Sequence, residues 1–125
     1  MNLKGLAVSQ GGKEKPTDKA GKTERISITY TIDENPLAEI GQHTIYFRIV
    51  NPEGFVLADA GQSVRKFKSE KGDDIAYSRS VTVNYDGSKL TKSITWDQDA
   101  FNPGTYKVEV YIDGYFAGTE KLSLN

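Results

Sequence analysis

Strict alternation of apolar and polar residues is the feature that most constrains what this chain can fold into. Residues 25–32, RISITYTI, place Ile26, Ile28 and Tyr30 on one face and small hydroxylated residues on the other. A period of two in β-branched and aromatic residues is typical of a β-strand that buries one face. The same alternation recurs in four later segments: 43–50, 77–85, 90–97 and 106–112.

Turn signals separate these alternating segments. An Asp-Gly dipeptide at 86–87 stands between two of them and another at 113–114 follows the last one, and this dipeptide is a strong hairpin signal. Residues 51–54, NPEG, place proline at the second position of a turn, and residues 33–42 form a turn-rich link. No segment shows a sustained helical period, so the turns join strands and not helices.

These patterns predict an all-β fold, an antiparallel β-sandwich of seven to eight strands, with closure into a barrel as the alternative. Residues 55–59 are expected to add a short strand. The last strand follows the turn at 113–114, and Phe116, Leu122 and Leu124 are expected to pack inward from it.

The first 24 residues differ in composition from the rest. Residues 3–8 could form a strand, whereas residues 9–24 contain three glycines, a proline and no large apolar residue. We therefore expect residues 1–24 to be an N-terminal strand followed by a flexible polar loop or linker. Residues 25–125 are expected to form the sandwich domain.

Composition limits the classes of function. The 125 residues suffice for one domain, and 16 basic against 17 acidic residues leave a net charge of −1, which argues against a nucleic-acid partner. The absence of cysteine excludes disulfides and thiolate zinc sites, and no cofactor is expected. No apolar run is long enough for a signal peptide or for insertion into a membrane. We expect a domain excised from a longer protein; its oligomeric state stays open.

The segment NPGTYKVEV resembles the start of strand F in immunoglobulin-like domains. Gly104 precedes Tyr106, and Val108 stands where those domains carry a cysteine, with Ile28 at the partner position. The resemblance implies an immunoglobulin-like sandwich in which Tyr106 makes a corner hydrogen bond. Phe47 occupies the place of the usual core tryptophan, so the resemblance is to the broad class and not to antibody domains.

A narrower resemblance covers residues 25–125. The segments ISITYTIDEN and IYFRIVNPEG, with the final hairpin, look like C-terminal β-sandwich domains of Bacteroidetes envelope-associated proteins. This resemblance implies the cell envelope or periplasm as the location and offers no catalytic residues.

Aromatic residues are the candidate binding residues. Tyr46 and Tyr111 are out of phase with the apolar face of their strands, so we expect them to point outward as an exposed patch or as cross-strand pairs. Tyr115, at the hairpin tip, is a further candidate. Trp96 could stack on a sugar ring, but it is in phase with Ile94, which indicates a place in the core.

Catalytic and metal-binding patterns are sparse. The lone His43 opens a strand, and no GxSxG nucleophile turn is present. Asp97 and Asp99 could offer oxygen ligands to Ca²⁺, although aspartates also begin turns. We therefore expect neither an enzyme nor a metal site. The predicted function is a non-catalytic module for protein–protein contact, adhesion or spacing in a larger envelope protein. The alternative is a carbohydrate-binding module that uses exposed aromatic residues, so a protein or a glycan is the expected partner.

Overall fold

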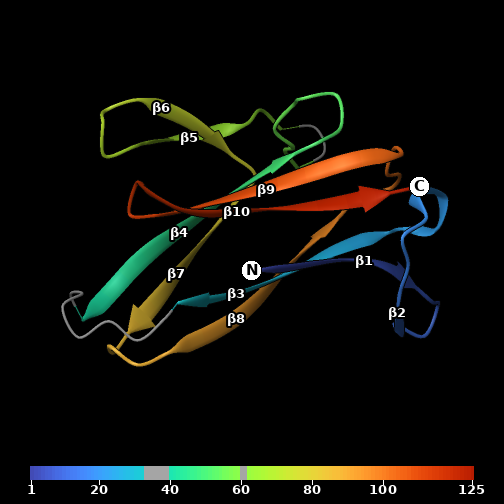
Figure 1. Cartoon of the computed structure of the whole chain (residues 1–125), viewed down its shortest axis with the longest axis horizontal. Helices are drawn as coiled ribbons and strands as arrows, with labels where there is room; N and C mark the ends of the chain where they lie inside the picture. Colours follow the sequence, from blue (N-terminus) through green and yellow to red (C-terminus); the bar gives the residue numbers. More distant parts are fainter. Residues whose placement is uncertain (33–39, 60–61) are drawn as a thin grey trace.

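Two four-stranded antiparallel sheets lie face to face in the computed structural model, which describes residues 1–32, 40–59 and 62–125 (Figure 1). The N-terminal sheet has the order β2-β1-β3-β8 and consists of Glu14–Pro16, Asn2–Val8, Arg25–Ile32 and Leu90–Asp97. The C-terminal sheet has the order β10-β9-β4-β7 and consists of Tyr115–Leu124, Gly104–Ile112, Gly41–Val50 and Arg79–Tyr85. Two short strands, β5 (Arg65–Lys68) and β6 (Asp74–Tyr77), form a separate hairpin.

The prediction of an antiparallel all-β sandwich is confirmed. The described ranges contain ten strands instead of seven to eight, because β2, β5 and β6 have only three or four residues and are too short to show alternation. Within these ranges no ladder joins the two four-stranded sheets, so they form a sandwich and not a closed barrel. The helices of the described part are limited to a 3-10 turn at Ala20–Lys22, and none is long or apolar enough to cross a membrane.

The strand predicted at 55–59 is wrong: Val56 forms only an isolated bridge to Val50, because the chain pairs there once after a turn and then leaves the sheet. The turn-rich link predicted at 33–42 lies mostly outside the described residues, which omit 33–39.

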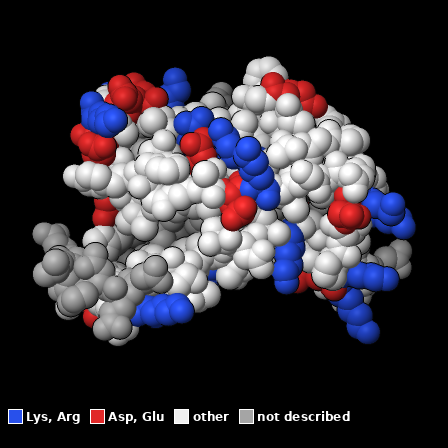
Figure 2. All heavy atoms as spheres, viewed as in Figure 1, with Lys and Arg blue, Asp and Glu red and all other residues white. Residues whose placement is uncertain are grey.

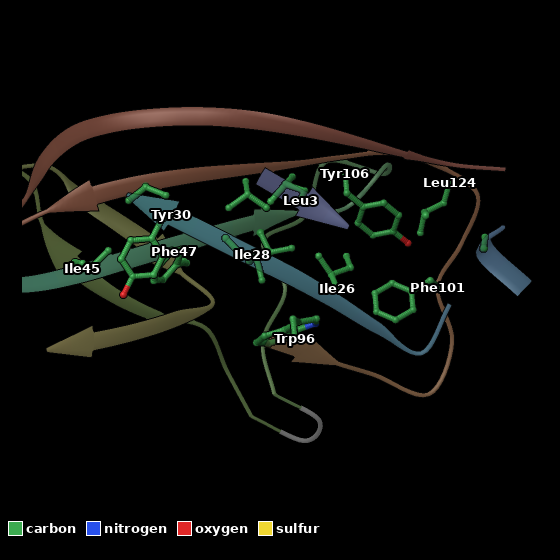
Figure 3. Packing of buried hydrophobic residues seen from close by; sticks show 14 of the residues in the cluster. Leu3, Ile26, Ile28, Tyr30, Ile45, Phe47, Trp96, Phe101, Tyr106 and Leu124 are labelled. Atoms are coloured by element: carbon green, nitrogen blue, oxygen red, sulfur yellow. The ribbon is translucent and has the colours of Figure 1, made fainter. Parts of the chain in front are cut away.

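The core fills the space between the two sheets (Figure 3). The inward residues of the alternating strands supply most of it, as their period of two requires. Ile28 and Val108, which stand at the cysteine positions of the resemblance, are both fully buried. The phenol of Tyr106 donates to the carbonyl oxygen of Asn102 over 2.9 Å, which confirms the predicted corner hydrogen bond.

The first 24 residues contribute to the N-terminal sheet. β1 pairs antiparallel with β3 and places Leu3 in the core, and β2 pairs with the second half of β1. Ala20 and Thr23 are buried, and the hydroxyl of Thr23 donates to the carbonyl oxygen of Lys19 over 2.8 Å. These contacts place part of the polar segment against the sandwich.

A β-bulge in β10 changes which side chains face the core. The pairing with β9 shifts by one residue between Phe116 and Gly118. Leu122 and Leu124 therefore pack against the core as predicted, but the inward placement of Phe116 is wrong. Before the bulge the phase is reversed, so Phe116 lies opposite the outward residue Tyr111 and is 56% exposed.

The β5–β6 hairpin lies on the outer side of the C-terminal sheet, away from the N-terminal sheet (Figure 1). Phe67 of β5 is buried there, and its ring stacks on Tyr46 of β4 with centroids 4.1 Å apart. The backbone N–H of Glu70 donates to the carbonyl oxygen of Gly114 over 3.0 Å. A Cβ at Gly114 would lie 2.9 Å from the carbonyl oxygen of Lys68, so only glycine permits this close approach.

Candidate functional site

The predicted outward tyrosines form a cross-strand pair. Tyr46 of β4 lies directly opposite Tyr111 of β9, and both side chains leave the outer face of the C-terminal sheet. Phe67 stacks on Tyr46 and contacts Tyr111 edge-on at 5.2 Å, while Tyr77 packs edge-on against Tyr46 at 5.0 Å. These two tyrosines are therefore half-buried under the β5–β6 hairpin and present no open patch.

The exposed aromatic rings lie at the tip of the β9–β10 hairpin. Tyr115 is 62% exposed, and Phe116 contacts Tyr111 edge-on at 5.5 Å with its other side open to solvent. Tyr115 was predicted as a candidate, whereas the sequence pattern placed Phe116 in the core. Gly118, an isolated glycine at the bulge within β10, is a sequence signal that could have indicated it.

Trp96 is not available for stacking on a ligand. It is only 2% exposed, its indole N–H donates to the side-chain oxygen of Gln98 over 3.0 Å, and the guanidinium of Arg79 lies 5.1 Å from its ring centre. The expectation of a sugar-binding surface at Trp96 is wrong, because the residue belongs to the core, as its phase with Ile94 indicated.

Asp97, the last residue of β8, and Asp99 border a polar cleft. The cleft has a volume of about 490 Å³ and is lined by Glu24, Arg25, Asp59, Asp97 and Asp99, among others. Arg25 donates to both carboxylate oxygens of Asp97, over 2.7 and 3.0 Å, and lowers the pKa of this carboxyl below its ordinary value. Within the described residues no group of three or more His, Cys, Asp or Glu side chains could hold a metal ion. Both carboxylate oxygens of Asp97, a predicted candidate ligand for Ca²⁺, thus accept hydrogen bonds from Arg25.

His43 is half-buried, and its Nδ1 is hydrogen-bonded to a carboxylate oxygen of Asp113. The other carboxylate oxygen of Asp113 accepts from the backbone N–H of Thr44 over 2.9 Å, and the backbone N–H of Asp113 donates to the carbonyl oxygen of Thr44 over 2.9 Å. These contacts hold the β9–β10 turn against β4, so the role of His43 and Asp113 is structural.

A cluster of basic residues lies on the outer face of β4, β9 and β10. Lys107 of β9 and Lys121 of β10 are directly paired in the ladder. Glu109 is the carboxylate between the cations: its oxygen is 3.7 Å from Nε of Arg48 and 3.8 Å from Nζ of Lys107. Lys121 forms no ion pair with any carboxylate in the part of the chain that the structure describes. We call Arg48, Lys107 and Lys121 the cation cluster.

The cation cluster leaves one of its donors unused. Nε of Arg48 is buried without a hydrogen-bond partner among the described residues, since Glu109 is too far for a hydrogen bond. Glu109 lies near Arg48 and Lys107, so the three cations and this carboxylate together carry a charge of +2. Figure 2 shows lysine and arginine side chains in a band across the middle of one face, with acidic side chains beside it. The small overall charge therefore hides a local excess.

A recess lies between the tips of the β5–β6 and β9–β10 hairpins. Its volume is about 190 Å³. Ile75, Tyr111 and Phe116 supply apolar walls, and Glu70, Lys71 and Asp73 are among its polar lining residues. The recess and the cation cluster are both on the outer side of the C-terminal sheet, and sequence reasoning identified neither.

The fold and these surfaces define a small antiparallel β-sandwich protein with a local cation cluster on one sheet face. The chain belongs to the family described as "Domain of unknown function (DUF8428)", which matches residues 1–125. No curated protein matches the chain.

One similar solved structure is the alkylpurine DNA glycosylase AlkC of Pseudomonas fluorescens, bound to DNA containing an abasic site analog. The two chains are 14% identical with a TM-score of 0.49, and the match covers 98% of this chain but only 30% of the glycosylase chain. At this TM-score the likeness assigns no function to this chain.

The comparison nevertheless corrects two expectations from the sequence. The similar structure is a DNA-bound glycosylase, and no adhesion or envelope protein was found. This finding stands against the predicted module for contact, adhesion or spacing in the envelope, with its carbohydrate-binding alternative, and that expectation is withdrawn. It also stands against the exclusion of nucleic acid, in favour of a protein or a glycan as partner, and that exclusion is withdrawn as well. The resemblance to Bacteroidetes C-terminal domains stays a prediction.

Proposed function

We propose that this chain is a non-catalytic β-sandwich domain that binds nucleic acid through the outer face of β9 and β10. The proposal rests on one observation: Lys107 and Lys121 lie directly opposite each other, and the carboxylate near them, Glu109, lies between Lys107 and Arg48. Like charges at directly paired positions of an antiparallel ladder destabilise the sheet. An anion bound across the pair would remove this repulsion.

The chemistry of the cation cluster suits phosphate groups. Lysine ammonium groups and an arginine guanidinium bind phosphate oxygens through charge-assisted hydrogen bonds. Hydroxyl groups of Thr105 and Ser123 lie in the neighbouring row of the same ladder, 3.2 Å from each other, and offer further donors. Salt screens exposed charges over about 8 Å at physiological ionic strength, so this local excess matters more to a phosphate than the net charge of the chain.

The carboxylates support a role without catalysis. A carboxyl that acts as a general acid at neutral pH needs a raised pKa. Arg25 lowers the pKa of Asp97, and Lys68 lowers the pKa of Asp74, so both stay ionised. Neither carboxyl is therefore suited to act as a general acid at neutral pH.

We further propose that the sandwich belongs to the immunoglobulin-like class. The corner hydrogen bond of Tyr106 and the burial of Ile28 and Val108 at the paired core positions support this assignment. Strand β9, which contains Tyr106, then corresponds to strand F of immunoglobulin-like domains.

The test is fluorescence anisotropy with a labelled oligonucleotide at low salt. The double variant K107E/K121E should weaken binding by roughly tenfold or more, because it replaces two phosphate contacts with repulsion. The matched control is K4E/K92E, which changes the net charge equally on exposed residues of the N-terminal sheet. It should keep most of the affinity.

Two outcomes would overturn the proposal. Equal losses in K107E/K121E and K4E/K92E would show that only net charge matters. Binding of heparin as tight as binding of the oligonucleotide would show a general attraction to polyanions and no nucleic-acid site.

A further inference from the structure

The recess beside Phe116 has walls suited to a flat ring. Phe116 and Tyr111 meet edge-on at 5.5 Å and form one side, and Ile75 lies on the wall from β6. Phe116 is more than half exposed although it lies next to this apolar surface, so a planar group could stack on it and cover it. The volume of about 190 Å³ leaves room for one ring system and little more.

The polar lining favours a neutral group over a phosphate. Glu70 and Asp73 place two carboxylates at the recess against a single lysine, Lys71, and a phosphate would be repelled. Carboxylates do accept hydrogen bonds from the amino groups of nucleobases. The recess therefore suits a base, whereas the cation cluster suits the backbone that carries it.

The ladder places the recess and the cation cluster in one line. On β9, Tyr111 and Lys107 face the same way and are four residues apart, which corresponds to roughly 13 Å along the strand. On β10, their partners Phe116 and Lys121 follow the same line. A nucleic-acid strand whose phosphates contact Lys107 and Lys121 could thus place one of its bases against Phe116.

We infer that the recess between Phe116, Tyr111 and the β5–β6 hairpin binds one unstacked nucleobase, so that the domain prefers single strands to duplexes. This inference rests on the proposed function. In a duplex the bases are paired and stacked, and extruding one requires unpairing and unstacking that a single strand does not need. Base stacking on an aromatic side chain also tolerates any sequence, so the preference is for strandedness and not for a motif.

The experiment compares a labelled single strand with the duplex of the same sequence for the wild type, F116A and Y115A. The wild type should bind the single strand more tightly. F116A should weaken single-strand binding by roughly tenfold and leave duplex binding unchanged. Y115A removes an equally exposed neighbouring ring that does not line the recess and should change neither affinity.

A direct signal comes from F116W. Since Trp96 is buried, the fluorescence of the introduced indole should be quenched on addition of single strand and much less on addition of duplex. Unchanged single-strand affinity in F116A, or equal quenching by both ligands, would overturn the inference while K107E/K121E still weakened binding. If K107E/K121E had no effect, the proposed function itself would fail.

Discussion

Lys121 lies directly opposite Lys107 in the antiparallel ladder between β9 and β10, with both side chains on the outer face of the sheet. A hairpin without a bulge would have placed Glu120 opposite Lys107, which is a favourable pair. The bulge after Phe116 shifts the pairing by one residue and replaces that ion pair with two like charges. The same shift brings Leu122 and Leu124 to the core, so packing and charge pairing conflict at this place.

This conflict predicts that K121E stabilises the fold while it weakens nucleic-acid binding. The new carboxylate would face Lys107, and opposite charges at paired positions contribute about 0.2–1 kcal/mol. Urea unfolding would measure the gain as a higher midpoint with an unchanged slope. A lower midpoint for K121E would contradict the view that the lysine pair is a cost to the fold.

The β5–β6 hairpin depends on Phe67 for its attachment to the sheet. F67A removes a buried ring that stacks on Tyr46, and such truncations cost about 3 kcal/mol or more unless the element detaches. We expect the hairpin to detach, because it is a separate two-stranded unit. Hydrogen exchange should then speed up in β5 and β6 and hardly change in β3 and β9. A uniform loss of protection would show instead that the hairpin unfolds only with the core.

The corner hydrogen bond of Tyr106 should contribute to global stability. Y106F removes the bond to the carbonyl of Asn102 without removing the ring, at a cost of about 1 kcal/mol in unfolding free energy. Burial raises the pKa of this phenol above its ordinary value, so stability should also fall as the pH rises above about 10. Thermal melting of Y106F and of Y115F, whose phenol is exposed, at neutral pH and above about pH 10 checks both points. Equal melting of the two variants would contradict the expected role.

The ion pair between Arg25 and Asp97 predicts sensitivity to acid. Because the pKa of Asp97 is lower in the folded chain than in the unfolded chain, its contribution is present above about pH 4 and is lost as the pH falls further. Asp97 is largely exposed, so the contribution at neutral pH should be under about 1 kcal/mol. D97N should be slightly less stable than the wild type at neutral pH and equal to it in strong acid. A difference that persists in strong acid would point to packing and not to charge.

The sequence predicted the core better than the surface. Alternation placed Ile26, Ile28, Phe47 and Val108 inside because a half-buried strand repeats its environment every two residues, and all four are fully buried. It also placed Tyr46 and Tyr111 on the outer side of their strands. What alternation cannot supply is a contact between distant segments, so the cover that Phe67 forms over these tyrosines was not predictable.

The cation cluster could not be predicted from the sequence for a related reason. Its members come from three strands, and only the pairing register shows that Lys121 meets Lys107 and that Arg48 meets Glu109. The register depends on the bulge, which changes the phase of β10 by one residue. A net charge of −1 counts the same residues without their positions, so it could not reveal the cluster.

The salt dependence of oligonucleotide binding tests the central claim most directly. Each phosphate contact to a single strand contributes about −0.7 to the slope of log Kobs against log salt, so three cations predict a slope near −2. In K107E/K121E the slope should fall toward zero together with the affinity. A wild-type slope close to zero, or a slope that the double variant leaves unchanged, would contradict the claim that this cluster binds the backbone of nucleic acid.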